Sequence, residues 1–208
     1  KQDGNAFIDE AVKFGAAAVI TDNSEINLNE VPVLRVQNCR IALSKIAAEY
    51  FDNPSKKLTI IGITGTNGKT TTAFLVKSVL ENANLKVATL GTLGLIAKGQ
   101  QHINTLTTPD PITLNKILND LYLEGFSHIV MEVSSHAIDQ YRIEDIKFKI
   151  ACFTNITPEH LDYHGTFENY KNTKAKLFQL LRKGSKAIIN IDDDFGEQLI
   201  RSLPIESF

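Results

Sequence analysis

Short apolar runs alternate with amphipathic segments of helical spacing from Leu58 to the end of the chain. The apolar runs predict strands at 58–63, 86–90, 127–133, 150–154 and 186–191, with two shorter strand-like pieces around Leu95 and Ile103. The amphipathic segments predict helices at 69–83, 111–124, 167–181 and 195–202. Alternation of this kind predicts an α/β fold: a mostly parallel sheet with flanking helices, and ligands bound at the carboxyl ends of the strands.

The first part of the chain has its own, shorter pattern. It predicts a helix at 6–14 closed by Gly15, strands at 16–21 and 31–36, and a helix at 41–51. The polar, proline-containing segment 52–57 starts nothing periodic and is predicted to be a linker. We therefore expect two domains, 1–56 and 57–208. The chain opens on Lys1 directly before a helical pattern, which suggests part of a longer protein.

Charge and cysteine content narrow the class of protein. The net charge of −2 comes without a basic stripe, so we expect no nucleic-acid or membrane partner. Cys39 and Cys152 form no C-x-x-C pair and are expected to be reduced thiols of a cytoplasmic protein. The residues from Lys1 onward have no signal-peptide pattern, and no apolar run approaches the roughly 20 residues of a membrane span.

The stretch ITGTNGKTTT at 63–72 predicts a phosphate-binding loop between a buried strand and a helix. It departs from the usual P-loop spelling, which would place glycine where this chain has Ile63. Gly65 and Gly68 allow a tight turn, and Lys69 adds a cation at a helix N-terminus. The alternative is a glycine turn with a solvated lysine. The predicted phosphate ligands are Gly65, Thr66, Asn67, Gly68, Lys69, Thr70 and Thr71.

A phosphate loop of this kind also needs metal ligands. Thr70 is placed to offer its hydroxyl to Mg²⁺, and Glu132, near the end of a buried strand, is the candidate carboxylate ligand. The alternative for Glu132 is a hydrogen-bonded residue at the sheet edge. His160 and His164 are four residues apart without an H-E-x-x-H motif, so a zinc protease site is not expected, and by itself His160 is typical of a structural histidine.

Four further residues have open interpretations on the sequence alone. Helical spacing places Lys174 among several lysines of one amphipathic helix, which predicts a solvated side chain. Arg142 suits a carboxylate or phosphate, because its planar fork can bind two oxygens, but it is equally typical of an exposed loop arginine. Thr107 and Thr108 are compatible with turn residues ahead of a helix that Asp110 caps.

Taken together, the motifs resemble the ATP-dependent Mur ligases, most closely the E type. The resemblance rests on TGTNGKTTT (64–72), LTTP (106–109), MEVSSHAIDQYRI (131–143) and FTNITPEHLDYHGTFENY (153–170), followed by Lys174. Ligases of this type add the third amino acid, meso-diaminopimelate or L-lysine, to UDP-N-acetylmuramoyl-L-alanyl-D-glutamate in peptidoglycan synthesis. The resemblance implies that 1–56 is the rear of a small α/β UDP-binding domain, that 57–208 is an incomplete P-loop-type ATP-binding central domain, and that a C-terminal amino-acid-binding domain is absent.

The resemblance also implies a mechanism and its residues. ATP would phosphorylate the substrate carboxylate to an acyl phosphate, which the incoming amine attacks. Lys69, His160 and Lys174 would be catalytic, with Thr70 and Glu132 on one Mg²⁺. A second Mg²⁺ would be held by His160 and by a carbamate on Lys174, whose register Tyr170 fixes. The UDP-muramoyl dipeptide would meet Thr107, Thr108, Ser134, Gln140 and Arg142. The protein is expected to be monomeric.

Three other interpretations stay open at this point. A folylpolyglutamate synthase shares the loop and the ligase chemistry, but fits the EVSSH and HLDYHG segments poorly. A P-loop kinase or GTPase-like switch would leave Arg142 and the Lys174 helix unexplained. A non-catalytic homologue, or a fragment that serves as an interaction module, is the third.

Overall fold

The computed structural model describes residues 4–102 and 106–203 and divides into two compact units, Lys1–Leu43 and Ser44–Phe208. The first unit contains η1 (Gly4–Phe7), α1 (Ile8–Lys13), β1 (Val19–Thr21) and β2 (Val33–Arg35). β1 and β2 pair in parallel. The helix α2 (Cys39–Tyr50) spans the boundary between the units.

The second unit is built around a seven-stranded sheet of order β6-β5-β4-β7-β3-β8-β9. Its strands are β3 (Thr59–Thr64), β4 (Val87–Gly91), β5 (Gly94–Ala97), β6 (Gln100–His102), β7 (His128–Glu132), β8 (Phe148–Phe153) and β9 (Lys186–Ile189). β4, β7, β3, β8 and β9 run parallel to one another, and β5 and β6 are added beside β4 as an antiparallel edge. The sheet is therefore mostly parallel, as predicted.

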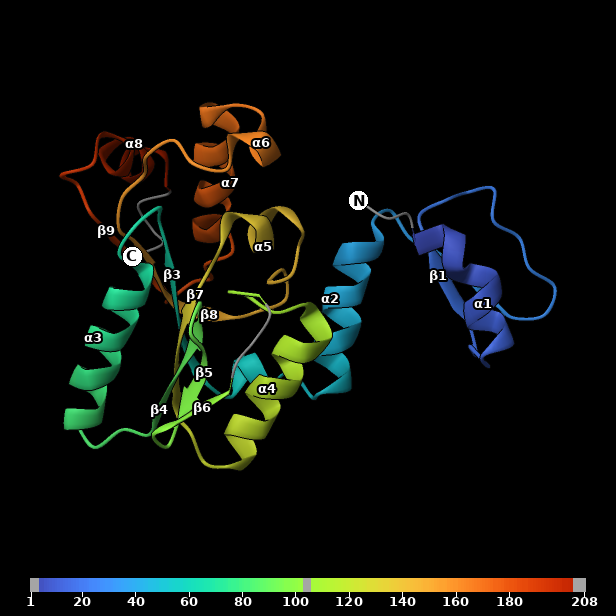
Figure 1. The fold of residues 1–208 in the computed structure, drawn as a ribbon, viewed down its shortest axis with the longest axis horizontal. Coiled ribbons are helices and arrows are strands. Elements are labelled where there is room, and N and C mark those ends of the chain that lie inside the picture. The colour runs from blue at the N-terminus through green and yellow to red at the C-terminus, as the bar shows by residue number, and fades with distance from the viewer. Residues whose placement is uncertain (1–3, 103–105, 204–208) are drawn as a thin grey trace. The chain divides into compact units, whose positions relative to one another are not determined.

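Helices cover both faces of this sheet (Figure 1). They are α3 (Lys69–Asn82), α4 (Pro111–Leu123), α5 (Ser135–Asp139), α6 (Leu161–His164), α7 (Phe167–Gln179) and α8 (Asp194–Ser202), preceded by η2 (Pro54–Lys56). Successive side chains of a strand point to opposite faces. Ile60 accordingly packs in the cluster that holds α4 and α7, whereas Ile61 and Ile63 pack in the cluster under α3. The α/β class and its two-sided helical cover are confirmed.

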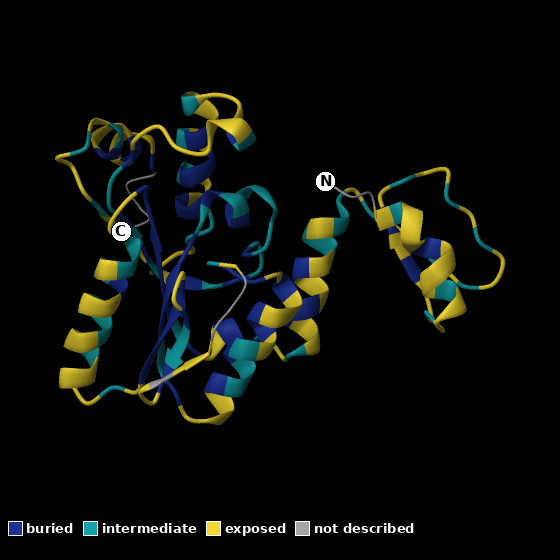
Figure 2. Ribbon diagram, viewed as in Figure 1, coloured by how far each residue is buried: buried dark blue, intermediate teal, exposed yellow. Residues whose placement is uncertain are grey.

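Burial follows this layering (Figure 2). Strands β3, β4 and β7 are buried along almost their whole length, and the exposed positions gather on the outer sides of the helices. Strands covered on both faces read as continuous apolar runs, which is why the sequence identified them. In the part of the chain that the structure describes, no helix is both long and apolar enough to cross a membrane.

Element boundaries differ from the predicted ones by a few residues, and several short elements were not predicted. The expected helix at 6–14 is split into η1 and α1, and the strand expected at 16–21 covers only Val19–Thr21. α5, α6 and η2 were not expected. Ile103 lies outside the described residues, and β6 ends at His102.

The segment predicted as a linker, 52–57, contains η2. Pro54 and Ser55 are buried, and the Ser55 hydroxyl donates a hydrogen bond to the Asp145 carbonyl at 3.4 Å. The two compact units meet at 43/44, within α2. A division of the chain into domains at 56/57 stays a prediction.

Candidate active site

The carboxyl ends of β4, β7, β3 and β8 lie side by side, because these strands are parallel neighbours in the sheet. The segments that leave these ends carry most of the residues that the sequence singled out. A parallel sheet exposes its strand ends and the N-termini of the following helices at this edge, where anions are bound.

The loop from Gly65 to Gly68 joins β3 to α3 and is held in a defined shape. Gly65 and Gly68 have φ angles of 148° and 82°, in the region that favours glycine. A Cβ atom on Gly65 would lie 1.9 Å from the Thr154 hydroxyl oxygen. Both the backbone conformation and the close approach therefore require glycine at position 65.

The segment that follows β8, residues 154–157, anchors this loop. The amides of Thr66 and Asn67 donate to the carbonyl and the side-chain oxygen of Asn155, at 2.9 and 3.0 Å. The Thr154 hydroxyl donates to the Asn67 carbonyl at 2.7 Å. The Thr157 amide donates to the Thr66 hydroxyl at 3.0 Å. Asn155 was not predicted, although it directly follows a buried strand.

Lys69 folds back over the loop. Its Nζ donates to the carbonyls of Gly65 and Thr66 at 3.0 and 2.8 Å. Burial lowers the pKa of Lys69, and the charges of Glu132 and Glu159 oppose this shift. The structure thus places a cation on the loop, while Asn67, Gly68 and Thr71 are exposed at its mouth.

Glu132 ends β7 and is only 3% exposed. Its Oε1 accepts hydrogen bonds from the Thr70 hydroxyl at 2.9 Å and the Thr92 amide at 3.0 Å, and its Oε2 accepts from the Thr92 hydroxyl at 3.0 Å. A Cβ on Gly91 would lie 2.2 Å from Oε1, so the carboxylate occupies space that only glycine leaves. Thr70 and Glu132 are thus brought together as predicted. Thr92 and Gly91 were not predicted.

Lys174 is 2% exposed, which contradicts the solvated side chain that helical spacing alone predicted. Its Nζ donates to the Gly65 carbonyl at 2.8 Å and lies 4.6 Å from the centroid of the Tyr170 ring. The pKa of Lys174 is lowered to about 7, first by burial and then by the charge of Lys69, with Glu159 opposing. Lys176, two residues on, is exposed.

His160 and His164 have different environments. The His160 side chain is 46% exposed, and its Nε2 lies 3.7 Å from the Glu159 carboxylate. His164 is buried, and its ring donates to or accepts from the Ser135 hydroxyl at 3.0 Å. His136 was not predicted; its ring centroid lies 4.8 Å from that of His160. Among the described residues, no three His, Cys, Asp or Glu side chains are grouped to hold a metal ion.

Glu159 links several of these groups and was missed by the sequence analysis. Its Oε2 accepts from the Tyr170 hydroxyl at 3.5 Å, and its charge acts on both Lys69 and Lys174. The signal available was its position directly before His160. A carboxylate here partly offsets the repulsion between the two lysines.

Thr108 joins the substrate-binding candidates to the metal-binding candidate. Its buried hydroxyl donates to the Glu132 carbonyl at 2.9 Å and accepts from the Ser134 amide at 3.2 Å. The Arg142 guanidinium donates to the Thr108 carbonyl at 2.9 Å and to the Gln140 side-chain oxygen at 2.6 Å. Thr108, Ser134, Gln140 and Arg142 therefore form one connected network, whereas the carboxylate role of Arg142 stays a prediction.

Thr107 lies at the edge of this network, with its hydroxyl 3.4 Å from the Thr92 hydroxyl. This contact places Thr107 beside a residue that holds Glu132. Thr107 and Thr108 precede α4, whose N-cap is Asp110 as predicted: its carboxylate accepts from the Ile112 and Thr113 amides.

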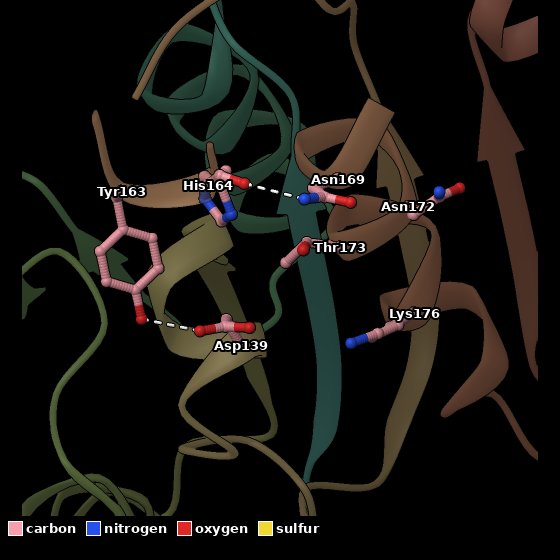
Figure 3. Close-up of a pocket in the computed structure, with 7 residues that line it drawn as sticks. All are labelled: Asp139, Tyr163, His164, Asn169, Asn172, Thr173 and Lys176. Carbon is pink, nitrogen blue, oxygen red and sulfur yellow. Dashed lines mark hydrogen bonds between the residues drawn. The ribbon is translucent and has the colours of Figure 1, made fainter. Parts of the chain in front are cut away.

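A polar cavity of about 250 Å³ opens between α5, α6 and α7 (Figure 3). The Tyr163 hydroxyl donates to the Asp139 carboxylate at 2.7 Å, and the Asn169 side-chain amide donates to the His164 carbonyl at 3.0 Å. The Gln140 side-chain amide donates to the Tyr163 hydroxyl at 3.1 Å. The cavity wall is therefore connected to the hydrogen-bond network that contains Gln140 and Arg142. None of its side chains was predicted as a site residue.

Comparisons with known proteins show which family the chain resembles. The family described as "Mur ligase middle domain" matches residues 63–206. A UDP-N-acetylmuramoyl-L-alanyl-D-glutamate–2,6-diaminopimelate ligase of Caldanaerobacter subterraneus subsp. tengcongensis is 42% identical over 202 residues, which is 97% of this chain and 42% of that protein. The chain thus spans about two fifths of the length of that relative.

Solved structures give the same result. A structure of a UDP-N-acetylmuramoyl-L-alanyl-D-glutamate–2,6-diaminopimelate ligase is similar with a TM-score of 0.81 and 32% identity, over 95% of this chain and 39% of that one. The MurF ligase of Thermotoga maritima, solved in complex with ADP, has a TM-score of 0.57 and 26% identity, over 96% and 43% of the two chains.

Proposed function

Because the chain belongs to the Mur ligase family, we propose that it forms the nucleotide-binding part of a ligase acting on UDP-N-acetylmuramoyl-L-alanyl-D-glutamate. The ligase joins the substrate carboxylate to the amine of meso-diaminopimelate through an acyl phosphate. The names of the relatives support this substrate pair and favour meso-diaminopimelate over L-lysine. A cytoplasmic location and a monomeric state stay predictions.

The loop of residues 65–71 is the proposed site for the phosphates of ATP. Backbone amides, a helix N-terminus and Lys69 supply the donors that phosphate oxygens need. Thr70 and Glu132 are oxygen ligands of the type Mg²⁺ prefers, and they meet at 2.9 Å at the end of the loop. Bound Mg²⁺–ATP would supply the phosphoryl group and neutralise its charge.

The observation that carries the proposal is the burial of the Lys174 amine against the phosphate loop. A protonated lysine at this place would add positive charge that the Gly65 carbonyl and Glu159 only partly offset. With its pKa lowered to about 7, Lys174 has a large neutral fraction in neutral solution, whereas an ordinary lysine is almost fully protonated there. Such an amine adds to CO₂: the N–C bond forms, a C=O electron pair moves to oxygen, and the nitrogen loses one proton.

The product is a carbamate. Its oxygens can bind a metal ion, whereas an ammonium group has no acceptor atom with which to do so. Together with His160 it would hold a second Mg²⁺, as proposed. The other residues would act by position. Lys69 is the proposed contact of the phosphates, and the proposed contacts of the UDP-muramoyl dipeptide are Arg142, Gln140, Thr107, Thr108 and Ser134.

The ligase activity is tested in the full-length protein by measuring phosphate release. We expect release only when UDP-N-acetylmuramoyl-L-alanyl-D-glutamate and meso-diaminopimelate are both present. Equal release with ATP alone would indicate a P-loop hydrolase. Release that depends on a folate substrate would identify a folylpolyglutamate synthase instead.

The role of Lys174 has a separate test. Lys174→Ala should reduce turnover by at least about 100-fold, and added acetate should partly restore it by supplying the missing carboxylate oxygens. Lys176→Ala is the matched control, because it removes an exposed lysine from the same helix. Full activity of Lys174→Ala would rule out the carbamate.

A further inference from the structure

A second cavity, of about 540 Å³, lies at the amino ends of β3, β8 and β9. Its lining comes from the first residues of β3 and β8 and from the segments just before β3, β8 and β9. Since the strands are parallel, this is the edge of the sheet opposite the phosphate loop. The proposed ligase chemistry therefore uses none of it.

Five cations line this cavity, hereafter the basic cavity: Lys56, Lys57, Lys147, Lys149 and Arg182. No acidic side chain is among the described residues that line it. The whole chain has a net charge of −2, so the cluster does not follow from a basic composition. Its members come from three separate segments that the fold brings together.

Only some of these cations have partners within the chain that offset their charge. Lys57 forms an ion pair with Asp52, and the Lys149 ammonium donates to the Gly184 carbonyl at 2.7 Å. Within the described residues, no carboxylate lies within 4.0 Å of the cationic groups of Lys56, Lys147 or Arg182. Like charges gathered in one concave site repel each other, and a bound anion would offset that cost.

The rest of the lining identifies which groups are available to a ligand. The hydroxyls of Ser55 and Ser185 already donate to the Asp145 and Phe148 carbonyls, at 3.4 and 2.8 Å. Phe148 is buried beneath. Recognition in this cavity therefore rests mainly on the ammonium and guanidinium groups, which bind phosphate oxygens by charge-assisted hydrogen bonds, with Thr59 as a further polar residue of the lining.

We propose that the basic cavity binds phosphate groups, and that the groups bound together carry at least two negative charges. The source is either a soluble polyphosphate, including a nucleotide, or the headgroups of anionic phospholipids. Both present the same phosphoryl oxygens to Lys56, Lys147 and Arg182, and the two sources are separated by experiment.

The first arm uses inorganic tripolyphosphate and the isotope-labelled protein, followed by NMR. We expect amide shifts at 55–59, 147–149 and 182–185 that saturate independently of any shifts at the phosphate loop. Arg182→Glu should weaken the response at these amides about tenfold or more. Lys183→Glu is the matched control: it makes the same charge change at an exposed neighbour that does not line the cavity, and it should leave the response in place.

The second arm measures co-sedimentation with vesicles of phosphatidylcholine, with and without phosphatidylglycerol. Lipid headgroups are the source if binding needs phosphatidylglycerol, is lost in Arg182→Glu and is kept in Lys183→Glu. In that case tripolyphosphate causes no response. A tripolyphosphate response with the same mutational pattern identifies a soluble phosphate. The absence of both responses, or equal responses in the two variants, overturns the proposal. Unchanged amide spectra away from the cavity establish that Arg182→Glu is folded.

Discussion

A lysine amine that is buried against a main-chain carbonyl loses most of the hydration that keeps it protonated. Lys174 is in this situation, with the Gly65 carbonyl at 2.8 Å and the Tyr170 ring beneath it. Lys69 adds like charge, so the protonated form is disfavoured twice. The residue is thereby suited to react as a neutral nucleophile at a pH where an ordinary lysine does not.

The pH dependence of carbamate formation follows from this shift. Below about pH 7 the Lys174 amine is protonated and does not add to CO₂; above that pH it is neutral, whereas an ordinary lysine titrates near 10.5. At constant dissolved CO₂ we expect a ¹³C carbamate signal that grows as the pH rises through about 7 and is absent in Lys174→Ala. A signal that grows only near the ordinary lysine pKa would contradict the burial effect.

At this scale, the sequence identified the residues whose role depends on their neighbours in the chain. Gly65, Gly68 and Lys69 are recognisable because a tight turn before a helix needs them in fixed order. The environment of Lys174 was predicted wrongly, because helical spacing says which lysines share a face but not which face meets the loop. Glu159 was missed because its partners are brought close only by the fold.

Among the elements, the segment 154–157 depends on α8 as well as on β8. The Asp193 carboxylate caps α8, with one oxygen accepting from the Phe195 and Gly196 amides, and its other oxygen accepts from the Ile156 amide at 2.8 Å. One side chain thus connects a helix terminus to the segment that anchors the phosphate loop. Loss of the Asp193 carboxylate is therefore expected to remove the cap of α8 and to weaken the position of segment 154–157 at the same time.

Asp193→Ala should lower the free energy of unfolding by about 2 kcal/mol, because it removes a cap and leaves the Ile156 amide without its acceptor. It should also weaken ADP binding, since the loop loses part of its support. Asp110→Ala is the control: it removes the cap of α4 and should cost about 1 kcal/mol without changing ADP affinity. Urea denaturation measures the free energy of unfolding of each variant, and titration measures its ADP affinity. Equal ADP affinities in the two variants would contradict the role of Asp193 in supporting the phosphate loop.

Among the helices, the long ones were predicted from their period. α3, α4 and α7 run for 13 or 14 residues, long enough to display a helical period. α5 and α6 have only five and four residues, too few for any period, yet they carry the histidines around His160. The parts of the site that stayed hidden are therefore those built on the shortest helices.

For the whole molecule, the hydrophobic interior belongs to one of the two units. Both buried clusters consist of residues between Leu58 and Leu203. The buried apolar side chains of the first unit, in its described part, are Ile8 and Val19. The segment 52–57 looked like a linker because composition records polarity and proline but not burial, and Pro54 is buried.

A variant that begins at Asn38 should therefore unfold cooperatively. It keeps all of α2, because the Asn38 side chain accepts from the Arg40 and Ile41 amides at 2.9 and 3.2 Å. We expect its Tm to lie within about 4 °C of the parent chain, a change of about 1 kcal/mol. Differential scanning calorimetry measures this, and a loss of the cooperative transition would show that the first unit contributes to the core.

The anchoring of residues 65–67 by 154–157 also has a thermodynamic consequence. A loop already fixed by backbone hydrogen bonds loses little conformational entropy when a ligand arrives, because that cost was met when the chain folded. Phosphate binding can then be rapid and need no ordering step. The motions that a catalytic cycle requires would have to come from elsewhere in the protein, leaving this loop as the fixed reference against which other parts move.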